Sequence, residues 1–204
     1  MRSISKHVLA RGVIHVSLGF AFVIALLLFS KLIVVLAIVV LTVAFLSLEF
    51  ARFRLPNLRQ WINRHLALFI RREEDSRLMG ASYFLIGSLI TVAAFPREIA
   101  SLAIVFLALG DPVATAVGRW RGRVRLWDKT VEGNLACLVV CLVAGGLTAS
   151  ILEKPQFVVA IVGAVFASLF QALPLPLNDN LTMPVGGALS MAVANAILRA
   201  VVVG

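Results

Sequence analysis

Seven long apolar runs dominate the hydropathy pattern of this chain, and short polar or charged connections separate them. Each run has 18 to 23 residues, close to the roughly 20 apolar residues that an α-helix needs to cross the hydrocarbon core of a bilayer. The pattern predicts an all-α integral membrane protein with about seven transmembrane helices. The predicted spans are Gly12–Phe29, Leu32–Phe50, Leu78–Phe95, Ile99–Val117, Gly133–Leu152, Gln156–Leu173 and Leu181–Val203.

Composition supports this interpretation. Of the 204 residues, 61% are hydrophobic and 14% are charged, whereas soluble domains have about 45–50% apolar and about 25% charged residues. No internal repeat or linker divides the chain, so we expect residues 1–204 to form one membrane domain. A net charge of +9 would suggest nucleic acid in a soluble protein. In a membrane protein it first reflects topology, and we expect no nucleic-acid partner.

The positive charges are distributed unequally between the two sides of the predicted bundle. With the N-terminus in the cytoplasm, 15 of the 19 Lys and Arg residues lie on the cytoplasmic side, and only Lys31, Arg97 and Lys154 lie in the opposite connections. Loops rich in Lys and Arg stay in the cytoplasm. We therefore expect a multi-pass protein of the cell membrane with a cytoplasmic N-terminus, whose first span is an uncleaved anchor.

One cytoplasmic connection, Pro56 to Arg72, has helical periodicity of its own. Its polar side chains lie opposite its apolar ones, which predicts an interfacial amphipathic helix near anionic lipid. A functional version of this interpretation has the helix border the entry route of a lipid substrate. The apolar positions are Leu58, Trp61, Ile62, Leu66 and Phe69.

Asp111 is an acid inside a predicted span, where a charged side chain costs about 2.5–3.5 kcal/mol on insertion scales. Gly110 and Pro112 flank it, so we expect a broken or kinked helix with free backbone groups. Ala114 and Gly118 share its helical face and leave room for close approach. The structural alternative is an acid paired with a neighbouring Arg.

A basic segment with two tryptophans follows, from Gly118 to Gly133. Its cations and aromatic rings are suited to a polyphosphate and its base, although topology alone also requires positive charge there. The more specific feature is the spacing of Lys129, Glu132 and Gly133, which predicts a cation and an acid on one face at the start of the fifth span.

A third polar cluster, Asn178-Asp179-Asn180, precedes the last span on the same predicted side. Locally it is typical of a turn and a helix cap. Because the cluster, the basic segment and Asp111 all lie at cytoplasmic helix ends, we expect the three regions to converge on one site.

Other polar residues have simpler interpretations. Glu49 and Arg52 are spaced for a structural ion pair, and Cys137 and Cys141 are expected to be packing residues. Glu73 and Glu74 fit a solvated cluster as well as a site, and His15, one helical turn after Arg11, is a weak candidate. Phosphate-loop, dinucleotide, zinc-protease and serine-hydrolase motifs are absent from the sequence. Acids beside cations at a membrane surface remain, and this pairing suits a Mg²⁺-bound nucleotide.

Two spaced motifs run through these regions. The first is Asp111-x-x-Ala114-x-x-x-Gly118 followed, after ten residues, by Lys129-Thr130-x-Glu132-Gly133, and the second is Asp179-Asn180-Leu181-Thr182-x-Pro184. The two motifs resemble the signatures of the polyprenol kinase family, which includes dolichol kinase, phytol kinase and a CTP-dependent diacylglycerol kinase. A weaker similarity to this family extends from Glu74 to Phe84.

The resemblance implies transfer of the γ-phosphate of CTP to the hydroxyl of a membrane lipid alcohol, with Mg²⁺, at the cytoplasmic surface. Asp111 and Asp179 would hold the metal, and Glu132 would be a further metal ligand or the base for the alcohol proton. Lys129 with Arg119 and Arg123 would neutralise the triphosphate. The nucleotide-binding set would be completed by Gly118, Thr130, Gly133 and Asn180.

Three other functions are open at this stage. A CTP-dependent phosphatidate cytidylyltransferase would use the same metal and nucleotide but attack the α-phosphate. An anion transporter could also use acids and broken helices, although transporter sites lie at the midplane. A structural membrane subunit would leave the convergence of the three regions unexplained. The acceptor is open as well, among polyprenol, dolichol, phytol and diacylglycerol.

Overall fold

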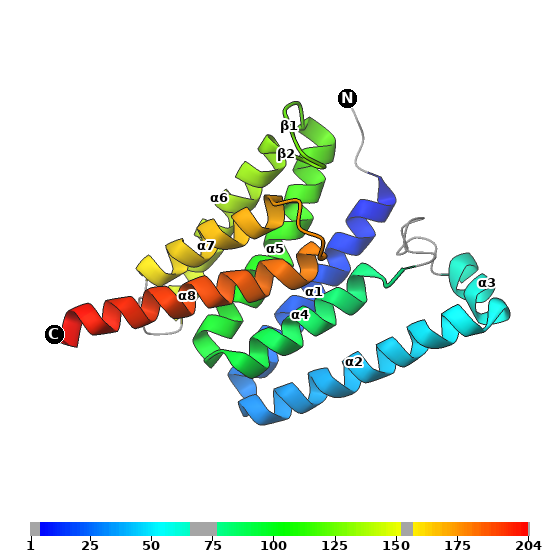
Figure 1. Cartoon of the computed structure of the whole chain (residues 1–204), viewed down its shortest axis with the longest axis horizontal. Helices are drawn as coiled ribbons and strands as arrows, with labels where there is room; N and C mark the ends of the chain where they lie inside the picture. Colours follow the sequence, from blue (N-terminus) through cyan, green and yellow to red (C-terminus); the bar gives the residue numbers. More distant parts are fainter. Residues whose placement is uncertain (1–4, 66–76, 152–156, 204) are drawn as a thin grey trace.

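The computed structural model describes residues 5–65, 77–151 and 157–203. In these ranges the chain forms eight helices and one short antiparallel strand pair, drawn in Figure 1. Seven of the helices coincide with the predicted apolar runs. The elements are α1 (Lys6–Leu28), α2 (Lys31–Arg54), α3 (Pro56–His65), α4 (Gly80–Ala94), α5 (Arg97–Arg121), β1 (Arg125–Leu126), β2 (Lys129–Thr130), α6 (Val131–Ile151), α7 (Phe157–Ala172) and α8 (Asp179–Val203).

Five of the described helices, α1, α2, α5, α6 and α8, are long and apolar enough to cross a membrane. α4 and α7 are apolar but shorter, with 15 and 16 residues. The structure thus agrees with an all-α membrane protein. The number of seven spans and the orientation of the N-terminus stay predictions.

α5 is the central helix of the bundle. It packs against α1, α6 and α8 and, over shorter stretches, against α4 and α7. α2 packs on α4 at one edge, with α3 at its end, and α7 lies between α6 and α8 (Figure 1). Every side chain from Ile99 to Ala108 is buried, so the apolar core is built around this part of α5.

α5 is not broken at Asp111, because it continues through Pro112 to Arg121, and a kink there stays a prediction. Proline removes one backbone donor but lets a helix continue where neighbouring helices hold it in place. The packing here is tight: a Cβ on Gly110 would lie 2.9 Å from the sulfur atoms of both Cys137 and Cys141 on α6. These two cysteines are buried and free, as predicted.

Two cations cap helices at the end of the bundle where α1 connects to α2 and α4 connects to α5. Lys31, at the start of α2, donates to the carbonyls of Ala93 and Phe95 at the end of α4, at 3.0 and 2.8 Å. Arg97, at the start of α5, donates to the carbonyl of Phe29 after α1, at 2.9 Å. Cations are favourable at helix C-termini. Both cations at this end of the bundle therefore have a structural use as helix caps.

α3 covers only the first part of the predicted amphipathic segment, since residues 66–76 lie outside the described part of the chain. Of its apolar positions, Ile62 is buried and Trp61 is exposed, with its ring stacked on that of His65. An interfacial position for this helix stays a prediction.

Candidate active site

An ion pair joins two of the three predicted regions. The ammonium of Lys129, on β2, donates to the carboxylate of Asp179, the first residue of α8. The two side chains are 23% and 27% exposed, so the pair is partly buried and solvent can still reach it. The contact brings together residues that are 50 positions apart in the sequence.

Two further acids lie near this pair. Asp111 on α5 and Asp128 in the hairpin turn are both close enough to Asp179 to act on its charge. Asp111 is half-buried and Asp128 is exposed. The structure therefore brings Asp111, Lys129 and Asp179 into one neighbourhood, as the convergence of the three regions predicts.

Two carboxylates, those of Asp111 and Asp179, are the groups at this point that could hold a metal ion. Within the described residues no group of three or more His, Cys, Asp or Glu side chains is arranged to hold an ion. Mg²⁺ in nucleotide sites is usually bound through one or two carboxylates, with phosphate oxygens and water completing its octahedron. Asp111 and Asp179 could form such a pair, while the Glu132 carboxylate bonds to the loop backbone instead.

Glu132 instead organises the loop after α5. Its carboxylate accepts hydrogen bonds from the backbone N–H groups of Arg123, at 3.0 Å, and Val124, at 3.2 Å. The expected shared face of Lys129 and Glu132 is wrong, because α6 begins only at Val131 and Lys129 belongs to the strand pair. The two side chains therefore turn toward different partners.

Thr130 ends β2, and α6 begins at the next residue. The Thr130 hydroxyl accepts a hydrogen bond from the N–H of Gly133, which caps the first turn of α6. The same hydroxyl faces Gly118, where an added Cβ would lie 2.8 Å from it. A Cβ on Gly133 would in turn lie 2.6 Å from the carbonyl of Ala114. The close approach that these glycines permit is thus between α5 and α6.

The remaining predicted cations lie at the surface of the same end. Arg119 on α5 and Arg123 in the loop are exposed, and Arg121 stacks over the ring of Trp120. Trp127 occupies the two-residue hairpin turn with a positive φ of 54°, a conformation that such turns require. The loop thus presents several cations to solvent beside the Lys129–Asp179 pair.

Asn180, predicted to bind nucleotide, points into the protein. Its amide nitrogen donates to the carbonyl of Gly80 on α4, at 2.9 Å, and its oxygen faces Nε2 of His15 on α1, at 3.1 Å. The residue is only 4% exposed. The spacing of His15 from Arg11 indicated a helical turn, and no local pattern indicated the contact with Asn180, because it depends on how α1, α4 and α8 pack.

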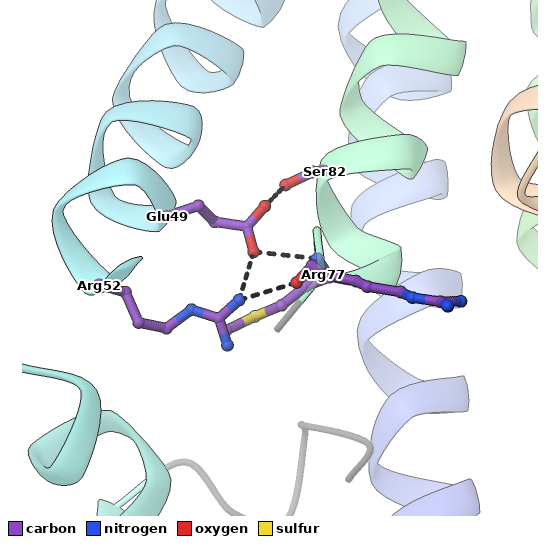
Figure 2. Close-up of polar contacts among 5 residues, drawn as sticks. Glu49, Arg52, Arg77 and Ser82 are labelled. Atoms are coloured by element: carbon purple, nitrogen blue, oxygen red, sulfur yellow. Dashed lines mark hydrogen bonds and ion pairs between the residues drawn. The ribbon is translucent and has the colours of Figure 1, made fainter. Parts of the chain in front are cut away.

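A second ion pair, between Glu49 and Arg52 on α2, confirms the predicted structural pair and is more extensive than expected (Figure 2). The Glu49 carboxylate accepts from Arg52 at 3.1 Å, from the backbone N–H of Met79 at 2.9 Å and from the hydroxyl of Ser82. Arg52 also donates to the carbonyl of Arg77, at 3.0 Å. Both members of the pair are almost completely buried. This cluster fastens the start of α4 to α2.

Glu73 and Glu74 lie outside the described residues.

Comparisons with known proteins find similarity along most of the chain. It is 26% identical to the CTP-dependent diacylglycerol kinase 1 of Schizosaccharomyces pombe, over 90% of this chain and 91% of the kinase. With the protein of the same name from Saccharomyces cerevisiae it is 24% identical, over 96% of this chain and 75% of the kinase. An uncharacterized protein of Rickettsia prowazekii is 25% identical, over 92% of this chain and 95% of that protein. No family model and no solved structure matches. The chain is thus a distant relative of CTP-dependent diacylglycerol kinases.

Proposed function

We propose that this protein is a membrane-bound, CTP-dependent lipid kinase that transfers the γ-phosphate of CTP to the hydroxyl of diacylglycerol or of an isoprenoid alcohol. The observation that carries the proposal is the contact between Lys129 and Asp179, which unites the two sequence signatures at one place. The distant similarity to CTP-dependent diacylglycerol kinases supports the nucleotide and the lipid nature of the acceptor. It also makes diacylglycerol the first acceptor to test.

The proposed nucleotide site lies between the end of α5, the strand pair and the start of α8. Asp111 and Asp179 would hold the Mg²⁺ of a Mg²⁺–triphosphate, and Lys129 would exchange Asp179 for the phosphate oxygens as its partner. Arg119 and Arg123 supply further positive charge from the exposed loop. Bound Mg²⁺ would neutralise phosphate charge, which is the main requirement of phosphoryl transfer together with positioning.

In the proposed reaction the lipid hydroxyl oxygen attacks the γ-phosphorus of CTP. The new P–O bond forms as the bond to the bridging oxygen of the β-phosphate breaks, and CDP leaves. The hydroxyl proton passes to the carboxylate of Asp111 or Asp179. Lys129 and the two arginines stabilise the charge on the transferred group.

Glu132 has a different part in this proposal from the ligand or base that its motif suggests. Its carboxylate holds the backbone of the loop at Arg123 and Val124. We assign it the role of fixing the loop that presents Arg123, and leave metal binding to Asp111 and Asp179.

The proposed site lies at the cytoplasmic surface of the membrane, with the N-terminus in the cytoplasm. The charge distribution of the loops supports this orientation. A site at the ends of membrane helices can receive a soluble nucleotide from water and a lipid hydroxyl at headgroup depth. α3 beside α2 then lies in the interface, where its exposed Trp61 suits the headgroup region.

The experiment uses purified protein in detergent–lipid micelles and CTP labelled at either the α or the γ position. The acceptor panel contains diacylglycerol, polyprenol, phytol and phosphatidic acid. The proposal predicts γ-label in a lipid product and none from α-labelled CTP. Label from the α position in lipid would instead identify a phosphatidate cytidylyltransferase. An absence of label in every lipid, with anion uptake into vesicles, would identify a transporter.

A further inference from the structure

Asn180 directly follows the proposed metal ligand Asp179 in the sequence. Both polar atoms of its side chain nevertheless make contacts inside the protein. Its Nδ2 donates to the carbonyl of Gly80, so its Oδ1 faces His15. This orientation makes His15 the donor, through Nε2. We call these three groups, the His15 ring, the Asn180 amide and the Gly80 carbonyl, the Asn180 clamp.

Both anchors of the clamp are themselves held in place. His15 is 7% exposed. Its ring meets the Phe84 ring of α4 edge-on, with centroids 5.0 Å apart and planes at 88°. The imidazole therefore has one defined position between α1, α4 and α8.

The other anchor belongs to the first turn of α4, which the buried cluster around Glu49 on α2 also holds (Figure 2). Glu49 accepts hydrogen bonds from Met79 and Ser82, the residues on either side of Gly80 and Ala81. Two turns after Gly80, a Cβ on Gly87 would lie 3.0 Å from the Cα of Leu181, so α4 and α8 are in backbone contact. The position of α8 relative to α4 is thereby set at its first residues.

We infer that Asn180 is a positioning residue, whose clamp orients the first turn of α8 so that Asp179 faces Lys129 and the nucleotide site. The inference deepens the proposed kinase function and rests on it for its kinetic part. A misplacement of about 1 Å at a reacting group can reduce a rate about 100-fold. A residue that touches no substrate can therefore affect the rate strongly, by holding its neighbour.

The kinetic experiment compares Asn180→Asp with His15→Leu and His15→Gln. Asp at 180 can still accept from His15 but cannot donate to the Gly80 carbonyl, and Leu at 15 removes the donor. We expect Asn180→Asp and His15→Leu each to lower kcat about 10- to 100-fold and to raise the Mg²⁺ concentration that gives the half-maximal rate, with KM for the lipid unchanged. Gln at 15 retains a donor, so His15→Gln should recover most of the rate. Asn195→Ala, at the other end of α8, is the matched control and should leave the rate unchanged.

A direct role of Asn180 in binding nucleotide predicts a different pattern. In that case Asn180→Asp would raise KM for CTP while His15→Leu left the kinetics unchanged, and the inference would be overturned. It would also be overturned if neither variant changed kcat or the Mg²⁺ dependence.

A substrate-free measurement separates the inference from the kinase proposal. Thermal unfolding of the purified single variants and of the His15→Leu/Asn180→Asp double variant forms a double-mutant cycle. The clamp predicts that each single variant lowers Tm by about 2–6 °C and that the double variant lowers it no further than the larger single effect. Additive shifts would refute the clamp. If the wild-type protein transfers no γ-phosphate, the kinase proposal fails while this cycle still decides on the clamp.

Discussion

The Glu49–Arg52 pair and the Lys129–Asp179 pair have the same chemistry and opposite surroundings. The first is buried, and backbone and hydroxyl donors surround its carboxylate. The second is about one quarter exposed and stands beside two more acids and a loop rich in arginine. A buried pair surrounded by hydrogen-bond partners fixes helices, whereas a partly open pair with excess charge nearby can exchange its partner for a ligand. The surroundings of an ion pair thus distinguish a structural role from a proposed functional one.

The largest effect should come from removing the charge of the open pair. We expect Asp179→Asn, and likewise Asp111→Asn, to lower the rate of γ-phosphate transfer about 10²- to 10³-fold, because positioned charge is the main catalytic contribution in such sites. Tm should change little, since partly exposed pairs contribute about 0–1 kcal/mol. Initial rates and thermal unfolding of the same preparations measure both. The exposed Glu98→Gln at the start of α5 is the control, and near wild-type rates in either aspartate variant would remove that residue from the site.

The buried pair should respond in the opposite way. Glu49→Ala leaves the Arg52 guanidinium buried without its carboxylate, which typically costs about 3–5 kcal/mol. We expect a large loss of folded protein, measured by thermal unfolding in detergent. The double variant Glu49→Leu/Arg52→Met removes both charges and should recover much of this stability. Equal stability of Glu49→Ala and wild type would show that the cluster does not hold α4 to α2.

Glu132 gives an intermediate test of which acids belong to the open site. Glu132→Gln keeps an oxygen that can accept from the loop backbone but loses the charge. If the residue only fixes the loop, we expect a rise of a few-fold in KM for CTP and a change of less than about tenfold in kcat. Steady-state kinetics measures this split. A fall of about 10³-fold in kcat at unchanged KM would return Glu132 to the groups that contact the metal or the reacting atoms.

The smallest effect is expected at the opposite end of the bundle. Lys31→Met removes the cation from the C-terminus of α4, which is worth about 0.3–1 kcal/mol. Thermal unfolding should detect a shift of a few degrees at most, and the rate of transfer should not change. A large change in rate would mean that this end of the bundle is coupled to the site.

Run length and hydropathy were sufficient to predict the seven apolar helices, because a membrane span needs a long apolar run that few other structures need. The effect of Pro112 was not predictable in the same way. Whether a proline breaks a helix depends on the helices around it, and α5 has neighbours on most sides. The strand pair was also missed, since Arg125–Leu126 and Lys129–Thr130 are too short to show an alternating pattern.

For the candidate site, local spacing identified single residues and topology indicated their convergence. The Glu49–Arg52 pair was predictable because its members are three residues apart on one helix. The pair connects two helices through Met79 and Ser82, which lie at the start of α4. The partners of Asn180 on α8 likewise lie on other helices, α1 and α4. Such contacts depend on the packing of helices far apart in the sequence, which no local pattern encodes.

The most direct test of the central claim is a reversal of the open pair, Lys129→Asp together with Asp179→Lys. The double variant keeps an ion pair between β2 and α8 but places the carboxylate where a phosphate-binding cation is proposed and the cation where a metal ligand is proposed. Labelled γ-phosphate transfer to diacylglycerol and Tm are measured on the same sample. The account predicts a Tm within a few degrees of wild type and no detectable transfer. Transfer at a rate near wild type would contradict it, because the pair would then serve the fold alone.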